Sequence, residues 1–379
     1  MSSAARSAPP DPAPAIAPDA EPQQPGFARR LRVPLLLLAL VLLHHLGSWL
    51  YLGARRGVPL LDALNRWDSA LYSTVATRGA EGPLWAFLPL YPAAVRAGLW
   101  LLPGGLAPQV VGLLLSTLAL LLFVLAVTWA QGRVAPGDAR AALLPRGSWG
   151  WFVLLYWPVS YTLHSHHTEG LFLLLSFGAL WAAAGGRAVV AGLLAAACVW
   201  TRNQGVLVAV TAALLGLPQW RRFLLTGGLA FAGFLALLGY EAAGTGDPLA
   251  FLHAQGGWTH AASVGDVLRT FWFGNPWQNT NTGSLQRHAW YLLALALVPG
   301  LWRRSGPLGL YALLSLALIL LQGELVNAFR YTVVLFPLAF YAGERLERLP
   351  PWARGALALG LVWLNHELTR RYALGQWAY

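Results

Sequence analysis

The residue best suited to chemistry is an aspartate in a polar stretch between two long apolar runs. Asp68 follows an arginine and a tryptophan in the segment Arg66-Trp67-Asp68. A carboxylate held beside an apolar membrane surface can act as a general base near neutral pH. A solvated loop carboxylate without a chemical role would have the same spacing, so the spacing alone leaves both roles open.

Two arginines, Arg202 and Arg330, lie at the ends of apolar runs. A guanidinium in that position is costly unless it is paired, and its planar fork matches a phosphate bidentately. Snorkelling to lipid head groups is the alternative role. If both arginines face one cavity, we expect a lipid-linked phosphate as the ligand.

Three histidines and an acid lie close together in the segment 164–169. Histidines at this density can indicate zinc, but a zinc site needs three or four ligands on complementary faces. Adjacent histidines in a short turn rarely supply them, so we expect no metal site and no cofactor, and metal dependence stays open. Glu169 opens an apolar run, where a carboxylate complements the helix dipole, and we favour that role over catalysis.

The composition places these residues in a membrane protein. Of the 379 residues, 57% are hydrophobic and 11% are charged, and the mean hydropathy is +0.53. Since soluble chains are about a quarter charged, this composition excludes a soluble enzyme and a secreted disulfide scaffold. The net charge is +11, without a single lysine. The arginines lie in short loops between apolar runs, as the positive-inside rule requires, so we expect no nucleic-acid partner.

The apolar runs predict an all-α polytopic membrane protein with about eleven transmembrane helices. The runs lie at 33–54, 108–130, 149–164, 169–185, 188–201, 204–218, 223–243, 288–302, 307–322, 331–343 and 353–366. Residues 1–28 are predicted to form a disordered tail. We place this tail in the cytoplasm, because arginines precede the first span. Two outer loops, 55–107 and 244–287, are rich in Trp, Tyr, Pro and Gly, and we expect amphipathic helices in them. Asp247 fits the N-cap of one such helix.

Six short motifs follow one another in a fixed order along most of the chain. They are Arg66-Trp67-Asp68 with Tyr72, Phe87-Leu88-Pro89-Leu90-Tyr91-Pro92, Thr168-Glu169-Gly170-Leu171-Phe172, Thr201-Arg202-Asn203-Gln204-Gly205, Gly246-Asp247-Pro248 with Ala254-Gln255, and Phe329-Arg330-Tyr331. Their order resembles the PIG-V-type mannosyltransferases, the integral-membrane family that includes the second mannosyltransferase of GPI-anchor synthesis, and more closely its bacterial relatives. The resemblance covers residues 30–345.

The resemblance implies a GT-C glycosyltransferase fold across residues 29–379, with the catalytic site at the outer face of the cell membrane. The donor would be a polyprenyl-phosphate sugar, typically mannose, and Asp68 matches the catalytic base. The residues that would bind substrate are Arg66, Trp67, Tyr72, Tyr91, His167, Glu169, Arg202, Asn203, Gln255, Arg330 and Tyr331. The chain departs from the family at Gly170, where a serine is usual, and at His167, where a tyrosine is common. Both departures bear on the acceptor rather than on the base.

These observations predict an inverting glycosyltransferase that moves a sugar from a lipid-linked donor to an acceptor hydroxyl. The acceptor could be a glycolipid, a polysaccharide or a protein. A transporter or flippase of a lipid-linked saccharide is the alternative, and it would place its ionisable groups near the middle of the bilayer. The position of Asp68 in an outer loop favours the transferase.

Overall fold

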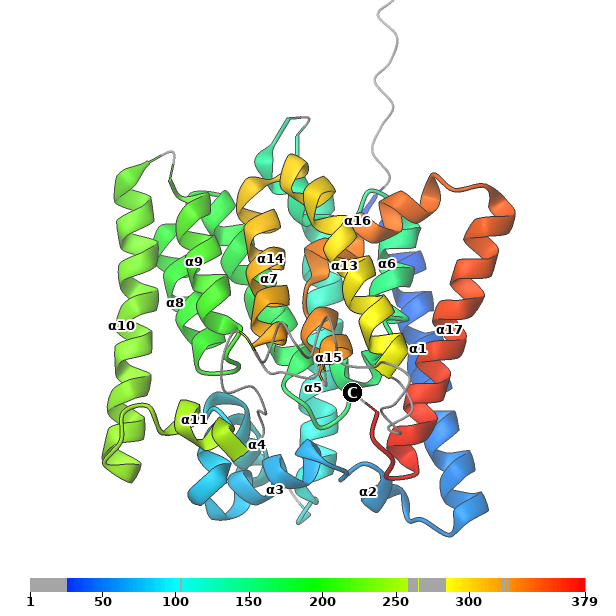
Figure 1. Cartoon of the computed structure of the whole chain (residues 1–379), viewed down its shortest axis with the longest axis vertical. Coiled ribbons are helices and arrows are strands. Elements are labelled where there is room, and N and C mark those ends of the chain that lie inside the picture. The colour runs from blue at the N-terminus through cyan, green and yellow to red at the C-terminus, as the bar shows by residue number, and fades with distance from the viewer. Residues whose placement is uncertain are drawn as a thin grey trace, which may run out of the picture.

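A computed structural model describes residues 26–102, 104–135, 137–217, 219–257, 265, 284–321, 325 and 327–378. Every regular element in these ranges is helical, which confirms the all-α prediction for this part of the chain (Figure 1). The helices are α1 (Phe27–Arg56), α2 (Leu60–Ala63), α3 (Asp68–Arg78), α4 (Leu90–Leu101), α5 (Pro108–Gln131), α6 (Ser148–Leu155), α7 (Glu169–Ala184), α8 (Ala188–Val199), α9 (Gly205–Leu215), α10 (Trp220–Thr245), α11 (Ala250–His253), α13 (Ser284–Arg304), α14 (Gly306–Leu320), α15 (Ala328–Val333), α16 (Phe336–Glu347) and α17 (Pro351–Ala373).

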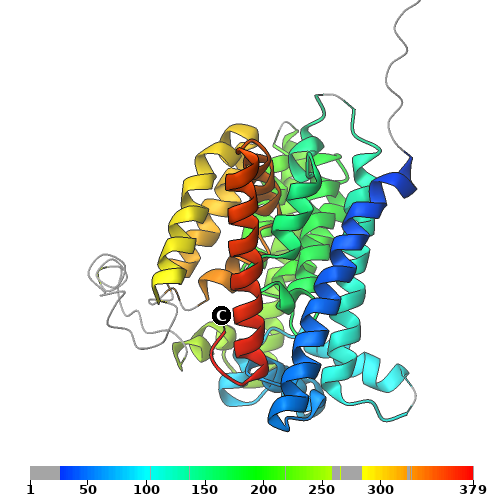
Figure 2. The ribbon, with the colours of Figure 1, turned by 90° about the vertical axis from the view of Figure 1, so that its right-hand side faces the viewer.

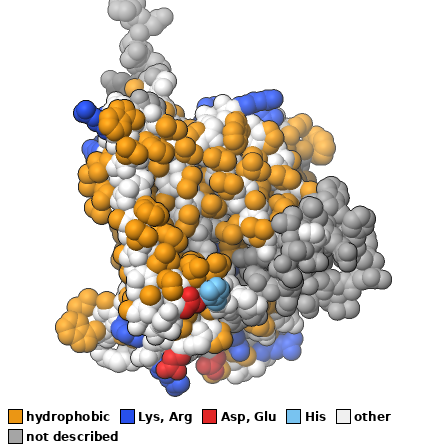
Figure 3. Space-filling model, turned by 60° about the vertical axis from the view of Figure 1, so that its left-hand side comes forward, with side chains coloured by type: hydrophobic (Ala, Val, Ile, Leu, Met, Phe, Trp, Pro, Cys, Tyr) orange, Lys and Arg blue, Asp and Glu red, His pale blue; other side chains and the backbone are white. Residues whose placement is uncertain are grey.

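Among the residues that the structure describes, the three helices α1, α5 and α10 are long and apolar enough to cross a membrane. Only 17% of the most apolar stretch of α10 is buried against the rest of the protein. Figure 3 shows hydrophobic side chains over the middle of one face, with charged side chains gathered at its upper and lower ends. An apolar band between two charged ends is typical of a protein that associates with a membrane.

Several helices are too short to cross a bilayer, and they create the space for a site. The 12 residues of α8 span about 18 Å at 1.5 Å per residue, whereas the hydrocarbon core is about 30 Å thick. The lower ends of α7, α8, α9 and α14 stop near the level of α15, above α3, α4 and α11 (Figure 1). Non-helical backbone at such depth is tolerated where it is buried in protein or lines a cavity.

Two predicted spans, 149–164 and 331–343, are not continuous helices. In the first, α6 ends at Leu155 and only a short 3-10 helix, Ser160–Leu163, follows. In the second, α15 ends at Val333 and α16 begins at Phe336. A proline ring clashes with the carbonyl four residues earlier. Pro158 and Pro337 therefore end the two helices where they do.

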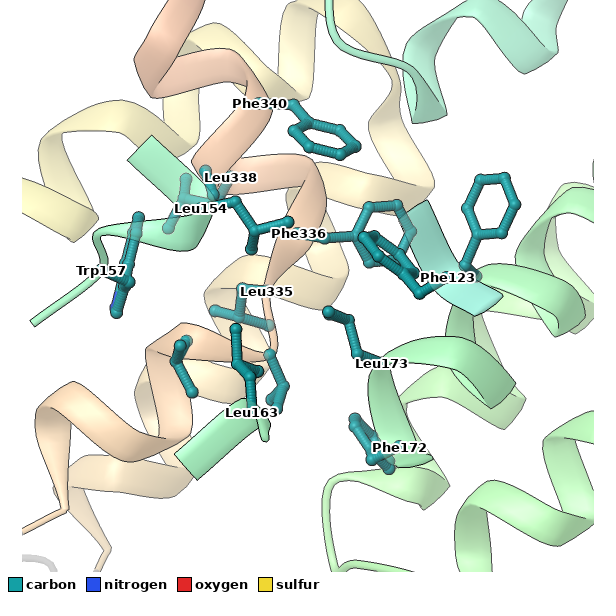
Figure 4. Close-up of a cluster of buried hydrophobic side chains, with 14 of the residues drawn as sticks. Phe123, Leu154, Trp157, Leu163, Phe172, Leu173, Leu335, Phe336, Leu338 and Phe340 are labelled. Atoms are coloured by element: carbon teal, nitrogen blue, oxygen red, sulfur yellow. The ribbon is translucent and has the colours of Figure 1, made fainter. Parts of the chain in front are cut away.

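Aromatic rings and leucine side chains pack together in the interior between α5, α6, α7 and α16 (Figure 4). The ring of Phe123 meets those of Phe177 and Phe336, each at 5.7 Å between centroids and nearly edge to face. The backbones of α6 and α16 can approach closely because Gly343 has no side chain. A Cβ at this position would lie 2.4 Å from the Cα of Gly150. Small residues at helix contacts are how membrane helices gain packing. The cluster thus packs α5, α6, α7 and α16 tightly against one another.

The predicted tail and outer loops are described in part. Residues 1–25 lie outside the described residues, while Phe27 and Ala28, predicted as tail, already belong to α1. The loop 55–107 contains α2, α3, α4 and the 3-10 helix Gly82–Ala86. Of the loop 244–287, α11 and the turn after it are described, and most of 258–283 is outside the described residues. Helix α1 runs from the upper end to the lower end beside α17 (Figure 2).

Candidate active site

A cavity of about 420 Å³ lies between the start of α3, the segment that joins α8 to α9, and α15. Eight of the twelve predicted site residues line it. They are Trp67, Asp68, Tyr72, Arg202, Asn203, Gln255, Arg330 and Tyr331. The structure therefore brings together residues separated by more than 260 positions, and it places both arginines in one cavity.

Asp68 reaches the cavity because it is the first residue of α3. The residue before it, Trp67, has a positive φ of 49°, a conformation that costs a residue with a side chain about 1–3 kcal/mol. The Trp67 indole meets the edge of Trp377 at 5.2 Å between centroids, and Ser73 on α3 donates to Asn65 Oδ1 at 2.8 Å. These contacts hold the strained turn that aims Asp68 into the cavity.

Four charged groups form one ion-pair network beside the cavity. The Glu169 carboxylate pairs with Arg202 at 2.6 Å and also accepts from Arg330 Nε. Arg330 in turn donates through Nη1 to Asp68 Oδ2. Glu169 is fully buried, whereas the Asp68 side chain retains 24% of its exposure. The charges alternate in sign, and Asp68 is the most exposed of the four side chains.

Glu169 opens α7 as the sequence indicated, but the dipole role favoured for it is incomplete. The first residue of a helix is a favourable place for a carboxylate, and Glu169 occupies it. Its two arginine partners come from the segment after α8 and from α15. Glu169 therefore joins three separate parts of the chain.

Arg202 follows the C-terminus of α8, where the helix dipole favours a cation. Its Nη1 donates to Thr168 Oγ1 at 2.8 Å, and the guanidinium lies over the Tyr331 ring at 5.5 Å from the centroid. Among the described residues, Arg202 Nε, Asn203 Oδ1 and Gln204 Oε1 are buried without a hydrogen-bond partner. Since buried polar atoms are normally satisfied, these three atoms point to a polar ligand in the cavity.

Arg66, Tyr91 and His167 do not line the cavity, although all three are predicted site residues. Tyr91 packs behind Tyr72, edge to face at 5.2 Å between ring centroids. Burial raises the pKa of Tyr72 to about 12 and raises the pKa of Tyr91 well above its usual range. Both phenols therefore stay protonated, and the Tyr72 ring faces the cavity in its neutral form.

The three neighbouring histidines face three different partners. His164 Nε2 contacts His45 Nδ1 at 2.7 Å, His166 Nδ1 contacts the Tyr91 hydroxyl at 3.0 Å, and His167 Nδ1 contacts the Ser165 hydroxyl at 2.8 Å. Their ring nitrogens thus do not converge on one point, as the ligands of a zinc ion must. The cluster serves as hydrogen-bonded packing around the turn before α7.

The departure at Gly170 has a steric reason. A Cβ at this position would lie 2.2 Å from the carbonyl oxygen of Leu163 and 2.8 Å from that of Ser116. No side chain fits there without moving the backbone. The serine usual in the resembling family therefore cannot occupy this position in the present packing.

Several cavity residues were not predicted from the sequence. Gln204 donates through Nε2 to the Tyr331 carbonyl oxygen at 3.0 Å, and it lay next to two predicted residues in its motif. Asn327 lines the cavity three residues before Arg330. Trp377 comes from the tail after α17, which Tyr161 fastens by donating to the Ala378 carbonyl oxygen at 3.2 Å. No motif pointed to Trp377, because it lies beyond the segment that carries the resemblance.

Comparisons with protein-family models, curated proteins and solved structures found no match for this chain. The resemblance to PIG-V-type mannosyltransferases thus remains a prediction that depends on the order of its motifs.

Proposed function

We propose that the chain is an inverting glycosyltransferase of the GT-C type, embedded in the cell membrane by about eleven spans. Its N-terminus would be cytoplasmic, and its site would face the opposite side. The observation that carries this proposal is the convergence of Asp68 with Arg202 and Arg330 at one cavity. A base beside two phosphate-binding groups is what transfer from a polyprenyl-phosphate sugar requires.

The phosphate of the donor would bind Arg202 and Arg330, with its lipid chain between the membrane helices. Glu169 holds both guanidiniums in place from behind, so their orientation is set before the donor arrives. Preorganised charges of this kind stabilise the charge that develops in a transition state, and removing one such donor commonly costs about 3 kcal/mol of activation free energy. Mannose is the sugar that we propose.

Arg330 links the phosphate site to the base. It now donates to Asp68 Oδ2, and a bound phosphate would compete with that carboxylate for the guanidinium. Donor binding would thereby free Asp68 Oδ2 to accept a proton. The base would become available only when the donor is in place.

In the reaction, the acceptor hydroxyl would attack the anomeric carbon from the face opposite the phosphate. The hydroxyl proton goes to Asp68, the new oxygen–carbon bond forms, and the bond from the anomeric carbon to the phosphate oxygen breaks. The products are the glycosylated acceptor and a polyprenyl phosphate, with the anomeric configuration inverted. The transition state is oxocarbenium-like, as in other glycosyl chemistry.

Asp68→Asn tests this role of the carboxylate, because it keeps the shape of the side chain and removes the base. We expect the rate of mannose transfer from polyprenyl-phosphate mannose to fall by roughly 10²–10⁴-fold, with KM for the donor little changed. Asp62→Asn is the matched control, because Asp62 is an exposed carboxylate on α2 that does not line the cavity. If Asp68→Asn retained the wild-type rate, the proposed base would be wrong.

A flippase of lipid-linked saccharides is the second candidate, and one observation favours it. Glu169, Arg202 and Arg330 are buried among apolar helices, which is where a transporter keeps its ionisable groups. A flippase would carry the donor across the bilayer without breaking the bond between sugar and phosphate. Recovery of intact donor on the opposite side, with no glycosylated product, would identify that activity.

A further inference from the structure

A second cavity, of about 610 Å³, lies beside the first and is separate from the proposed active site. It is bounded by α3, α4, α10 and the segments at 85–89 and 200, and Phe87 lines both cavities. Trp100, on its wall, is 87% exposed. Since α10 is a candidate membrane span, a lipid beside α10 is a possible occupant of this cavity.

Aromatic rings form the inner wall of this second cavity. The Tyr240 ring lies 5.7 Å from that of Trp85 and 5.7 Å from that of Trp200 between centroids. Trp200 is fixed to α10 because its Nε1 donates to the Gly233 carbonyl oxygen at 2.8 Å. Trp85 can pack against α10 because Gly244 has no side chain. A Cβ at Gly244 would lie 2.2 Å from the Trp85 ring. These contacts hold the three rings in fixed positions along one wall of the cavity.

A buried carboxylate lies next to these rings. Glu241 lines the cavity and is 1% exposed, and its Oε2 has no hydrogen-bond partner among the described residues. A buried carboxylate with one oxygen left without a partner is costly. A ligand that brings a cation would remove that cost, and aromatic faces attract organic ammonium ions in particular.

The same cavity also carries a cation at its rim. Arg96 on α4 is exposed and donates to the carbonyl oxygens of Ala76 at 2.7 Å and Val75 at 3.1 Å. In the described part of the chain, no ion pair joins Arg96 to Glu241, although both line one cavity. Two opposite charges that do not pair with each other suit a ligand that carries both charges.

We propose that this cavity binds the head group of a zwitterionic phospholipid such as phosphatidylethanolamine. The ammonium would lie against Glu241 and the three rings, and the phosphate would lie near Arg96, since guanidinium is the preferred phosphate partner. Trp and Tyr are enriched at the membrane interface, the depth at which head groups lie. The site would thus bind a structural or regulatory lipid close to the proposed active site.

Calorimetric titration of the detergent-purified protein with short-chain phosphatidylethanolamine or phosphatidylglycerol tests the proposal. We expect saturable binding of phosphatidylethanolamine and little binding of phosphatidylglycerol, which lacks the ammonium. Glu241→Gln should weaken the binding by roughly 10- to 100-fold, because a hydrogen bond to a charged group is lost. Tyr240→Leu should also weaken it while leaving the carboxylate in place.

Asp62→Asn, which removes an exposed carboxylate that does not line this cavity, should leave the binding unchanged. A melting temperature close to that of wild type would show that each variant is folded, and Tyr240→Leu gives an independent test if Glu241→Gln is not. Equal binding of the two lipids, wild-type affinity in a folded Glu241→Gln, or no binding of phosphatidylethanolamine would overturn the proposal. Soluble phosphoethanolamine competing at the same concentration as the lipid would also overturn it, because the ligand would then not be a phospholipid.

Discussion

Replacing Glu169 by glutamine removes the charge at the centre of the ion-pair network and keeps its shape. Glu169 is fully buried and pairs with Arg202 at 2.6 Å and with Arg330. The substitution leaves two buried guanidiniums without their shared carboxylate. Breaking a buried ion pair by removing one partner costs about 3–5 kcal/mol, so we expect Glu169→Gln to lower the free energy of unfolding by that amount. Reversible unfolding in mixed micelles with increasing SDS measures the difference.

Glu367→Gln provides the matched control. Glu367 also pairs with two arginines, Arg370 and Arg371, each at 2.8 Å, but all three lie on α17. The three side chains retain 14–37% of their exposure, and partly exposed pairs within one helix contribute less than about 1 kcal/mol. If Glu169→Gln lowered the free energy of unfolding no more than Glu367→Gln, the idea that burial makes the network essential to the fold would be refuted.

Two further predictions concern a glycine and an exposed pair. Gly170→Ser should lower the free energy of unfolding by about 1–3 kcal/mol through overpacking, because a Cβ there would lie 2.2 Å from the Leu163 carbonyl oxygen. Gly228→Ala should cause no such loss, because a Cβ at Gly228 would have nothing within 4 Å. Equal losses for the two variants in the same unfolding assay would contradict the steric argument. The hydrogen bond from His253 lowers the pKa of Asp247 below 3.8, so the pair contributes stability above that pH and loses it as the pH falls through the lowered value. NMR titration should show the Asp247 midpoint rising toward 3.8 in His253→Ala, and an unchanged midpoint would contradict the pairing.

Local signals in the sequence were enough to predict most helix positions. The apolar run predicted at 108–130 is α5, Pro108–Gln131, and the run at 223–243 is α10, Trp220–Thr245. The two runs that are broken, at 149–164 and 331–343, each contain a proline whose effect on the helix is local as well. Hydropathy alone did not predict these breaks, because it does not take into account that proline lacks a backbone N–H.

The site could be predicted only in part, because its geometry depends on contacts between distant helices. The motifs located Asp68, Arg202 and Arg330, which do line one cavity. They could not show that Glu169, 161 residues before Arg330, holds both arginines, since that depends on how three segments are placed. Trp377 and its packing against the strained turn before Asp68 were likewise invisible.

The most direct test of the proposed activity is to follow the fate of labelled sugar in proteoliposomes. Purified protein would receive polyprenyl-phosphate mannose, labelled in the sugar, with a lipid and glycan extract of its host, and Asp68→Asn would run in parallel. We predict that wild type releases polyprenyl phosphate and places the label on an acceptor with inverted anomeric configuration, while Asp68→Asn does not. If label stays on the carrier and both proteins move the intact carrier across the bilayer, the chain is a flippase and the proposed transfer is wrong.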